Sequence, residues 1–187
     1  MTREERRRRT EAAILLAAQE QFAEQGFERT TIRSVAGQAG VDPALVMQYF
    51  GSKEQLFGAS ARWTVDHKML GSATREELPA TALADMFEGF EDDMQRREAA
   101  LALLRNCLTH PSAAGVMRDD VMCEAQAAVA GTIGGDDAEL RAGVLGACMI
   151  GVTIARYLLE IPALTGATRE DLERVLLPAL RQVVDPG

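Results

Sequence analysis

The chain has 187 residues, of which 47% are hydrophobic and 5% aromatic, and its formal net charge is -8. The apolar residues are mostly Ala, Leu and Val, and no useful stretch alternates apolar and polar residues, which argues against a β-sheet and predicts an all-α fold. The spacing of Cys107, Cys123 and Cys148 matches no metal-ligand pattern, so we expect no zinc and no cofactor. Buried, reduced thiols are the simplest interpretation of these cysteines, and a redox sensor is the alternative.

The excess of acidic over basic residues lies entirely in the later part of the chain. Residues 1–57 hold eight Lys or Arg and eight Asp or Glu, whereas the remainder holds 12 and 20. An acidic body is repelled by phosphates, so the neutral N-terminal part is the part that could approach a nucleic acid; the charge distribution is consistent with DNA binding but does not show it. The longest uncharged stretch of the C-terminal half, Ala142–Ala155, is shorter than the ~20 residues that span a bilayer. Because the N-terminus also lacks an apolar signal region, we expect a cytoplasmic protein without membrane contact.

Residues 2–9 are mostly charged and include four consecutive arginines. They form either a disordered, solvated arm or a helix start whose arginines meet phosphates or enter a minor groove. Their position directly before the DNA-binding region favours the second interpretation.

A first helix is predicted over residues 10–25, where Ile14 and Phe22 belong to one apolar face. Gly26 follows, where a left-handed helix end is expected, and Phe27 then packs back on the helix. We expect this helix to brace the elements that follow it.

Residues 30–57 have the pattern of two short helices joined by a tight turn. Thr30 or Thr31 can cap the first helix, Gly40 can adopt the positive φ of the turn, and Asp42 can cap the second helix. The second helix directs Val46 and Phe50 inward and leaves Pro43, Ala44, Leu45 and Gln48 outward. This geometry is that of a helix-turn-helix, which reads the major groove of DNA.

The spaced residues of this region resemble the TetR family of bacterial transcriptional regulators. The agreement covers about the first third of the chain and comprises Ile14, Leu15, Ala18, Phe22, Gly26, Phe27, Thr30, Thr31, Ile32, Val35, Ala36, Ala39, Gly40, Val41, Phe50, Ser52, Lys53 and Leu56. The resemblance implies about nine helices, with a helix-turn-helix domain in residues 1–57 and a ligand-binding and dimerisation domain in residues 58–187. It also implies a homodimeric repressor that a small molecule releases from a palindromic double-stranded operator.

The DNA-contacting positions of the family can be carried over one by one. Base contacts fall on Arg33, Pro43, Ala44, Leu45 and Gln48, and phosphate contacts fall on Thr31, Tyr49 and Lys53. Gln48 suits a bidentate pair with adenine. Met47 lacks the hydroxyl that an aromatic residue offers at this position in many relatives, so we expect Met47 in the core.

The remaining helices are predicted from periodicity and caps. They cover Thr81–Phe90, Asp93–Leu108, Pro111–Ile133, Ala138–Glu160 and Arg169–Val184. The penultimate helix is apolar almost all round, so more than one of its sides must be covered. Either a second copy of the chain covers one side, in a four-helix interface with the last helix, or both sides are covered within the monomer. The expected interface residues are Gly143, Gly146, Ala147, Ile150, Gly151, Ile154, Leu172, Val175, Leu176 and Leu180.

A pocket for a small hydrophobic effector is expected among the middle helices, because methionine adapts to irregular apolar shapes. The candidate lining residues, each of which can also be plain core, are Trp63, His67, Met86, Phe87, Phe90, Met94, Leu104, Cys107, Met117 and Met122.

Two other functions compete with a DNA-binding regulator. An enzyme is disfavoured, because the sequence has no Ser/His/Asp set, metal cluster or phosphate-binding Gly loop. A helical adaptor that binds protein through its helix-turn-helix is disfavoured by the capped second helix and the phosphate-type residues around it.

Overall fold

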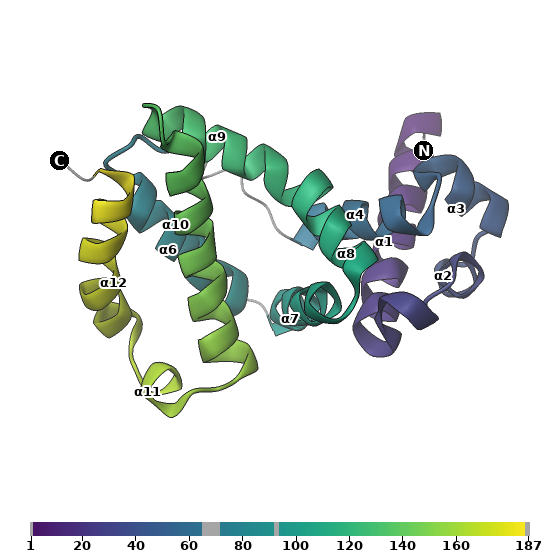
Figure 1. The fold of residues 1–187 in the computed structure, drawn as a ribbon. Coiled ribbons are helices and arrows are strands. Elements are labelled where there is room, and N and C mark those ends of the chain that lie inside the picture. Colours follow the sequence, from purple (N-terminus) through teal and green to yellow (C-terminus); the bar gives the residue numbers. More distant parts are fainter. Residues whose placement is uncertain (1, 65–71, 92–93, 186–187) are drawn as a thin grey trace. The chain divides into compact units, whose positions relative to one another are not determined.

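The computed structural model describes residues 2–64, 72–91 and 94–185, without the side chains of residues 63, 64, 95 and 96. Within these ranges the chain is helical and has no strand, which confirms the all-α prediction (Figure 1). The chain divides into two compact units, which we describe separately. Unit 1 comprises Met1–Val65 and Glu98–Val121, and unit 2 comprises Asp66–Arg97 and Met122–Gly187.

Unit 1 contains the helix-turn-helix and a second segment from the middle of the chain. Its elements are α1 (Arg3–Arg29), α2 (Ile32–Ala39), α3 (Pro43–Phe50), α4 (Lys53–Thr64), most of α7 (Met94–Thr109), α8 (Pro111–Val116) and most of the π-helical segment η1 (Met117–Met122). The core joins both segments, since Ile14, Val46 and Phe57 share it with Leu103 and Val116.

Helix α1 begins at Arg3 and not near residue 10. The Thr2 side chain accepts a hydrogen bond from the Glu5 N–H at 3.1 Å, and the Glu5 carboxylate accepts one from the Thr2 N–H at 2.7 Å. This reciprocal cap satisfies two backbone donors at the start of the helix. The disordered arm is therefore wrong, and the alternative of a helix start is what the structure contains.

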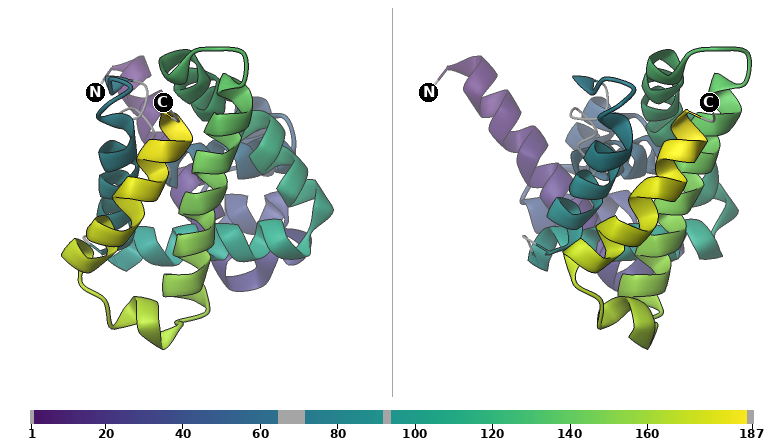
Figure 2. Two further views of the ribbon diagram at one scale, coloured as in Figure 1. Left: turned by 60° about the vertical axis from the view of Figure 1, so that its left-hand side comes forward. Right: turned by 90° about the vertical axis from the view of Figure 1, so that its left-hand side faces the viewer.

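In its described part, unit 2 is built from four long helices and one short one. Its elements are α6 (Leu78–Glu91), α9 (Cys123–Ile133), α10 (Ala138–Thr153), the π-helical segment η2 (Ile154–Leu158), α11 (Pro162–Thr165) and α12 (Arg169–Val184). Helix α12 packs between α6 and α10 (Figure 2). The predicted helix limits agree closely with these bounds, and the Thr168 side chain caps α12 as its sequence suggested.

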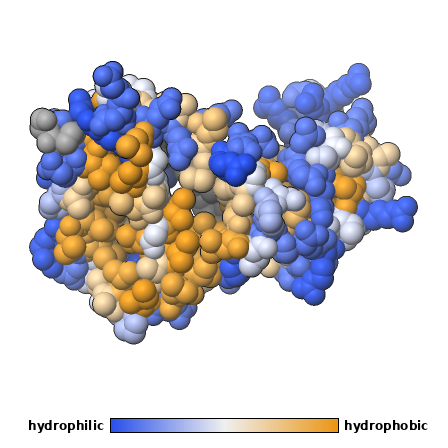
Figure 3. Space-filling view, viewed as in Figure 1, coloured by the Kyte–Doolittle hydropathy of each residue, from blue (hydrophilic) through white to orange (hydrophobic). Residues whose placement is uncertain are grey.

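Helix α10 has two apolar faces in different surroundings. Ala138, Ala142, Leu145 and Thr153 are buried in unit 2. Leu140 and Val144, on another face, are 69% and 40% exposed. The stretch Ala138–Leu158 is long and apolar enough to cross a membrane, with a mean hydropathy of 1.5. Only 22% of its most apolar part is buried within the structure. Unit 2 therefore leaves one side of α10 uncovered, and apolar surface gathers over α10 to α12 (Figure 3).

Candidate DNA-binding site

The turn between α2 and α3 is fixed by three adjacent residues. Gly40 ends α2 with φ of +68°, a left-handed conformation that favours glycine. The N–H of Val41 donates to the Ala36 carbonyl at 3.0 Å, which satisfies one of the last carbonyls of α2. Asp42 begins α3, where its side chain accepts from the Ala44 N–H at 2.7 Å and Pro43 takes the first helical position. The sequence thus determines how α3 leaves α2.

Helix α2 begins with a cap of its own. The Thr31 hydroxyl accepts from the Ser34 N–H at 3.0 Å, and the Ser34 hydroxyl accepts from the Thr31 N–H at 3.1 Å. Arg33 in the first turn is exposed, while Val35 and Ala36 are fully buried against α1 and α3. The cap therefore holds Arg33 at the solvent side of the helix pair.

The outer face of α3 carries no charged residue. Pro43, Ala44 and Gln48 are exposed, Leu45 is half-buried, and Val46 is completely buried beneath them. Four of the predicted base-contacting residues, together with the exposed Arg33, therefore have surface available to a partner, although contact with DNA stays a prediction.

Met47 differs from its predicted place in the core. Its side chain is 45% exposed. Consecutive helical residues point about 100° apart, so the burial of Val46 turns its neighbour outward, beside Ala44 and Gln48. Met47 therefore belongs to the exposed face of α3, a residue that reasoning from family aromatics missed and that helical spacing could have found.

The three predicted phosphate contacts lie in different surroundings. Thr31 is exposed, and Tyr49 is half-buried with its ring 6.1 Å from that of Phe50. The Lys53 ammonium turns inward: it donates to the Phe27 carbonyl at 2.9 Å and lies 4.4 Å from the Phe27 ring centroid. Lys53 thus ties the start of α4 to the end of α1, and the phosphate contact expected of it stays a prediction.

Three phenylalanine rings hold α1 against α4. Phe22 and Phe27 stack with centroids 5.9 Å apart, and Phe57 meets both edge-on at 5.0 and 5.2 Å. This arrangement requires a break in α1 at Gly26, whose φ is +78°. Thr30, 1% exposed, closes the break by donating its hydroxyl to the carbonyls of Gln21 and Gly26.

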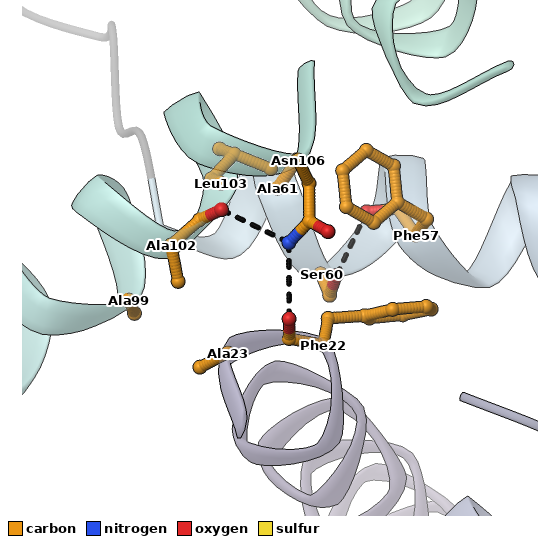
Figure 4. A pocket seen from close by; sticks show the side chains of 9 residues that line it. All are labelled: Phe22, Ala23, Phe57, Ser60, Ala61, Ala99, Ala102, Leu103 and Asn106. Atoms are coloured by element: carbon orange, nitrogen blue, oxygen red, sulfur yellow. Dashed lines mark hydrogen bonds between the residues drawn. The ribbon is translucent and has the colours of Figure 1, made fainter. Parts of the chain in front are cut away.

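Asn106 on α7 supplies the hydrogen bonds that the break in α1 leaves open. Its carboxamide oxygen accepts from the Phe27 N–H at 2.6 Å, and its nitrogen donates to the carbonyls of Phe22 at 3.0 Å and Ala102 at 2.9 Å (Figure 4). Asn106 is 5% exposed, so these groups have no water to replace it. A sequence pattern could not reveal this residue, because its partners lie about 80 positions away in the chain.

The cavity beside Asn106 is too small for an effector. It is lined by Phe22, Phe57, Ser60, Ala102 and Asn106 among others, and its volume of about 10 Å³ is close to the minimum for one water molecule.

The predicted effector-binding residues are divided between the two units. Met86 and Phe87 are buried in unit 2 with Phe90 packed on that core, whereas Cys107 and Met117 pack on the core of unit 1. Met94 is 68% exposed, Leu104 and Met122 are half-buried, and the Trp63 side chain and His67 lie outside the described residues. The pocket is therefore still a prediction.

The three cysteines were expected to be buried, but Cys123 is exposed and Cys107 and Cys148 are half-buried. Burial raises the pKa of the Cys107 thiol to about 11, so this group stays protonated at neutral pH, unlike a redox sensor. Within the described ranges, no group of three or more His, Cys, Asp or Glu side chains is arranged to hold a metal ion.

Two of the predicted interface residues are core residues of unit 2. Leu172 is 5% and Leu180 1% exposed, because the inner face of α12 packs on α6 and α10. Val175, on the outer face of α12, is 61% exposed. The remaining seven expected residues that keep exposed or partly exposed surface are Gly143, Gly146, Ala147, Ile150, Gly151, Ile154 and Leu176.

A charged cluster at the end of α10 was not predicted. Arg156 in η2 donates to the Glu91 carboxylate at 3.0 Å and to the Ala167 carbonyl at 3.0 Å, and also to the Leu164 carbonyl. Tyr157 donates to the same carboxylate at 2.9 Å, and burial, reinforced by this bond, raises the pKa of Tyr157 to about 12. The cluster fastens the α11 region to α6.

Comparison with known proteins matches both parts of the chain to one family. Residues 14–59 match a family model described as bacterial regulatory proteins, tetR family, and residues 79–184 match the tetracyclin repressor-like C-terminal domain.

The HTH-type transcriptional repressor Rv3405c of Mycobacterium tuberculosis is 43% identical over 77 residues, which are 41% of this chain and 38% of that protein. The HTH-type transcriptional activator FasR of Mycolicibacterium smegmatis is 30% identical over 112 residues, 60% of this chain and 44% of FasR. The chain thus aligns with less than half the length of these curated relatives.

Solved structures cover the chain more completely. A TetR-family regulator from Streptomyces coelicolor aligns with a TM-score of 0.69 and 28% identity over 94% of each chain. NalD, the secondary repressor of the MexAB-OprM multidrug efflux pump in Pseudomonas aeruginosa, aligns with a TM-score of 0.71 over 93% of this chain and 94% of its own, and its 19% identity shows the shared fold alone. The two family matches together span most of the described residues, so the chain belongs to the TetR family of bacterial transcriptional regulators.

Proposed function

We propose that this protein is a cytoplasmic, homodimeric transcriptional repressor that binds a palindromic operator and is released by a small hydrophobic effector. The observation that carries the proposal is the outer face of α3. A glycine turn and the Asp42 cap present it, and its exposed side chains have no structural task in unit 1.

The composition of this face suits a major groove. Gln48 can form two hydrogen bonds with an adenine edge, and Ala44 and Met47 can contact thymine methyl groups. Arg33 is a candidate for a base or phosphate oxygen, and Thr31 and Tyr49 are candidates for phosphates. Lys53 is a further phosphate candidate, whose ammonium also donates to the Phe27 carbonyl.

The uncovered side of α10 supports a homodimer. Leu140, Val144, Ala147 and Gly151 recur at helical spacing along this side and are all exposed. A second copy would supply the apolar surface that covers them, together with Val175 of α12. Two copies of the helix-turn-helix could then occupy half-sites about one helical turn apart.

Control by an effector follows if the effector favours a dimer conformation whose half-site spacing is wrong, since DNA affinity then falls. Repression is the form of control proposed, while the curated relatives include a repressor, an activator and the dual regulator CecR of Shigella flexneri.

Selection from a random duplex library tests the proposal. We expect enrichment of a palindromic sequence. Arg33→Ala combined with Gln48→Ala should weaken binding by about 1–3 kcal/mol for each base that is no longer recognised, with the fold intact by circular dichroism. Gln126→Ala in α9 is the matched control and should bind as the parent does. Failure of the parent protein to enrich any duplex would overturn the proposal.

A further inference from the structure

The first two turns of α1 form a helix that covers nothing in its own unit. Residues 2–9 are all exposed, and none of them is apolar. They precede residue 14, where the family match begins. Figure 2 shows this end of α1 projecting from the other helices of unit 1. The extension therefore has a purpose that neither the core nor the family pattern explains.

Its arginines follow the register of the buried face of α1. Ile14, Ala17 and Ala18 are 0%, 4% and 0% exposed, and each has an arginine eleven positions earlier in the chain. Eleven residues make slightly more than three turns of an α-helix, so the paired positions point in nearly the same direction. The arginines at these positions, here named the N-terminal arginine face, are Arg3, Arg6 and Arg7.

The neighbouring charges on the same turns have other surroundings. Arg8 and Arg9 lie eleven positions before Gln19 and Glu20, which are half-buried and exposed and flank the packed side of α1: Gln19 donates to the Ser60 carbonyl at 3.2 Å, and Glu20 accepts from the Gln38 carboxamide. Glu4 pairs with Arg8 at 3.2 Å, with 62% and 78% of these side chains exposed.

Acids do little to neutralise the N-terminal arginine face. The Glu5 carboxylate is engaged in the cap with the Thr2 N–H at 2.7 Å. Glu11 borders the face one turn after Arg7 and is half-buried. Three positive charges thus continue the line of the packed side of α1 beyond the edge of unit 1.

We infer that the N-terminal arginine face binds phosphates of the DNA backbone next to the half-site that α3 occupies. This inference rests on the proposed DNA-binding function. Guanidinium groups bind phosphate in a bidentate geometry. A protein partner would require an apolar centre in the interface, and a membrane surface would require apolar side chains to insert, and residues 2–9 provide neither.

The reach of the extension determines which part of the duplex it contacts. Arg3 lies eleven residues before the first buried residue of α1, which places it about 16 Å farther along the helix axis. Phosphates follow each other every 3.4 Å of rise along one strand, so this length spans about five of them. With α1 lying along the duplex, as the proposal requires, the arginines bind outside the base pairs read by α3 and add affinity without adding sequence preference.

A pair of charge-matched variants tests the inference on the full-length protein. Arg6→Gln with Arg7→Gln removes two charges from the N-terminal arginine face, and Arg8→Gln with Arg9→Gln removes two from the other side of the same turns. Binding is measured over a range of salt concentrations to the duplex enriched by selection. This duplex is used in two lengths. The short duplex contains the two half-sites only, and the long duplex has about one helical turn of DNA added at each end.

We expect the parent protein to bind the long duplex more tightly than the short one, and the Arg6/Arg7 variant to lose this gain. For the Arg6/Arg7 variant on the long duplex, the slope of log K against log salt concentration should become shallower by about 0.9 for each phosphate that is no longer neutralised. The Arg8/Arg9 variant should keep the parent's slope and its tighter binding to the long duplex. Equal losses in the two variants, or no loss in either, would overturn the inference while leaving the proposed function intact. If the parent enriches no duplex at all, the proposed function fails first.

Discussion

The core of unit 1 is built around three phenylalanine rings and a buried asparagine, whereas the core of unit 2 is mostly aliphatic around Phe87 and its helix α10 is covered on one side. In unit 1 the large exposed apolar residues Leu16, Met47 and Leu108 lie on three different helices. Among those of unit 2, Leu140, Val144 and Val175 lie on two helices that pack together, while Met94, Leu159 and Ile161 lie outside these helices.

This difference shows how each unit obtains its stability. Unit 1 closes its aromatic core with its own residues and uses Asn106 to satisfy the backbone groups at the break in α1, whereas the buried Gln21 Oε1 has no hydrogen-bond partner among the described residues. Unit 2 has apolar surface left over, and contiguous apolar surface in a soluble protein marks an interaction site. We therefore expect unit 1 to respond to changes inside it and unit 2 to respond to changes on its surface.

The largest effect is expected from Asn106→Leu, which should remove the hydrogen bonds that stabilise the break in α1 of unit 1. The Phe27 N–H and the Phe22 carbonyl would lose their partner while remaining buried, at a cost of about 3 kcal/mol in the free energy of unfolding. Hydrogen exchange should accelerate in α1 and α2, with little change in α12. Denaturant unfolding gives the magnitude, and Thr109→Val, three residues along α7, is the control expected to change it by less than about 0.5 kcal/mol. A variant as stable as the parent would show that water replaces the amide.

A second substitution tests whether a partner copy covers the exposed apolar side of α10 in unit 2. Val144→Asp places a carboxylate in the uncovered face of α10, where a partner copy would have to bury it. Sedimentation should show a monomer, and operator affinity should fall by about two orders of magnitude, since each half-site then binds alone. Ala127→Asp, at an exposed position of α9, should stay dimeric. A dimeric Val144→Asp protein would place the interface elsewhere and remove the contrast between the units.

Sequence reasoning succeeded where the cause was local. The left-handed glycines, the caps of α3 and α12 and the five helices of the C-terminal part follow from neighbouring residues, and so did the helix-turn-helix. It failed where two distant segments meet. Asn106 was not singled out because its partners Phe22 and Phe27 are in α1, and the contact of Lys53 with the Phe27 carbonyl was not predicted because it is equally non-local. The phosphate contact expected of Lys53 stays a prediction.

The predicted interface illustrates the same limit on one helix. Leu172 and Val175 have similar apolar character, and only the packing of α12 between α6 and α10 makes one buried and the other exposed. Periodicity shows that α12 has an apolar face, but it cannot distinguish a face covered by the same chain from one covered by a partner.

The smallest expected effect comes from two adjacent residues of α3. We expect Val46 to belong to the core of unit 1 and Met47 to its recognition surface. Val46 is 0% and Met47 45% exposed, so Val46→Ala should cost about 2 kcal/mol of unfolding free energy and Met47→Ala less than about 0.5 kcal/mol. Operator binding should respond in the opposite order once the proteins are compared at a temperature where both are folded. The Met47 side chain would then contribute to the DNA contact and not to the fold. Equal destabilisation by the two substitutions would show that Met47 is a core residue, and α3 would then have one residue fewer for DNA contact.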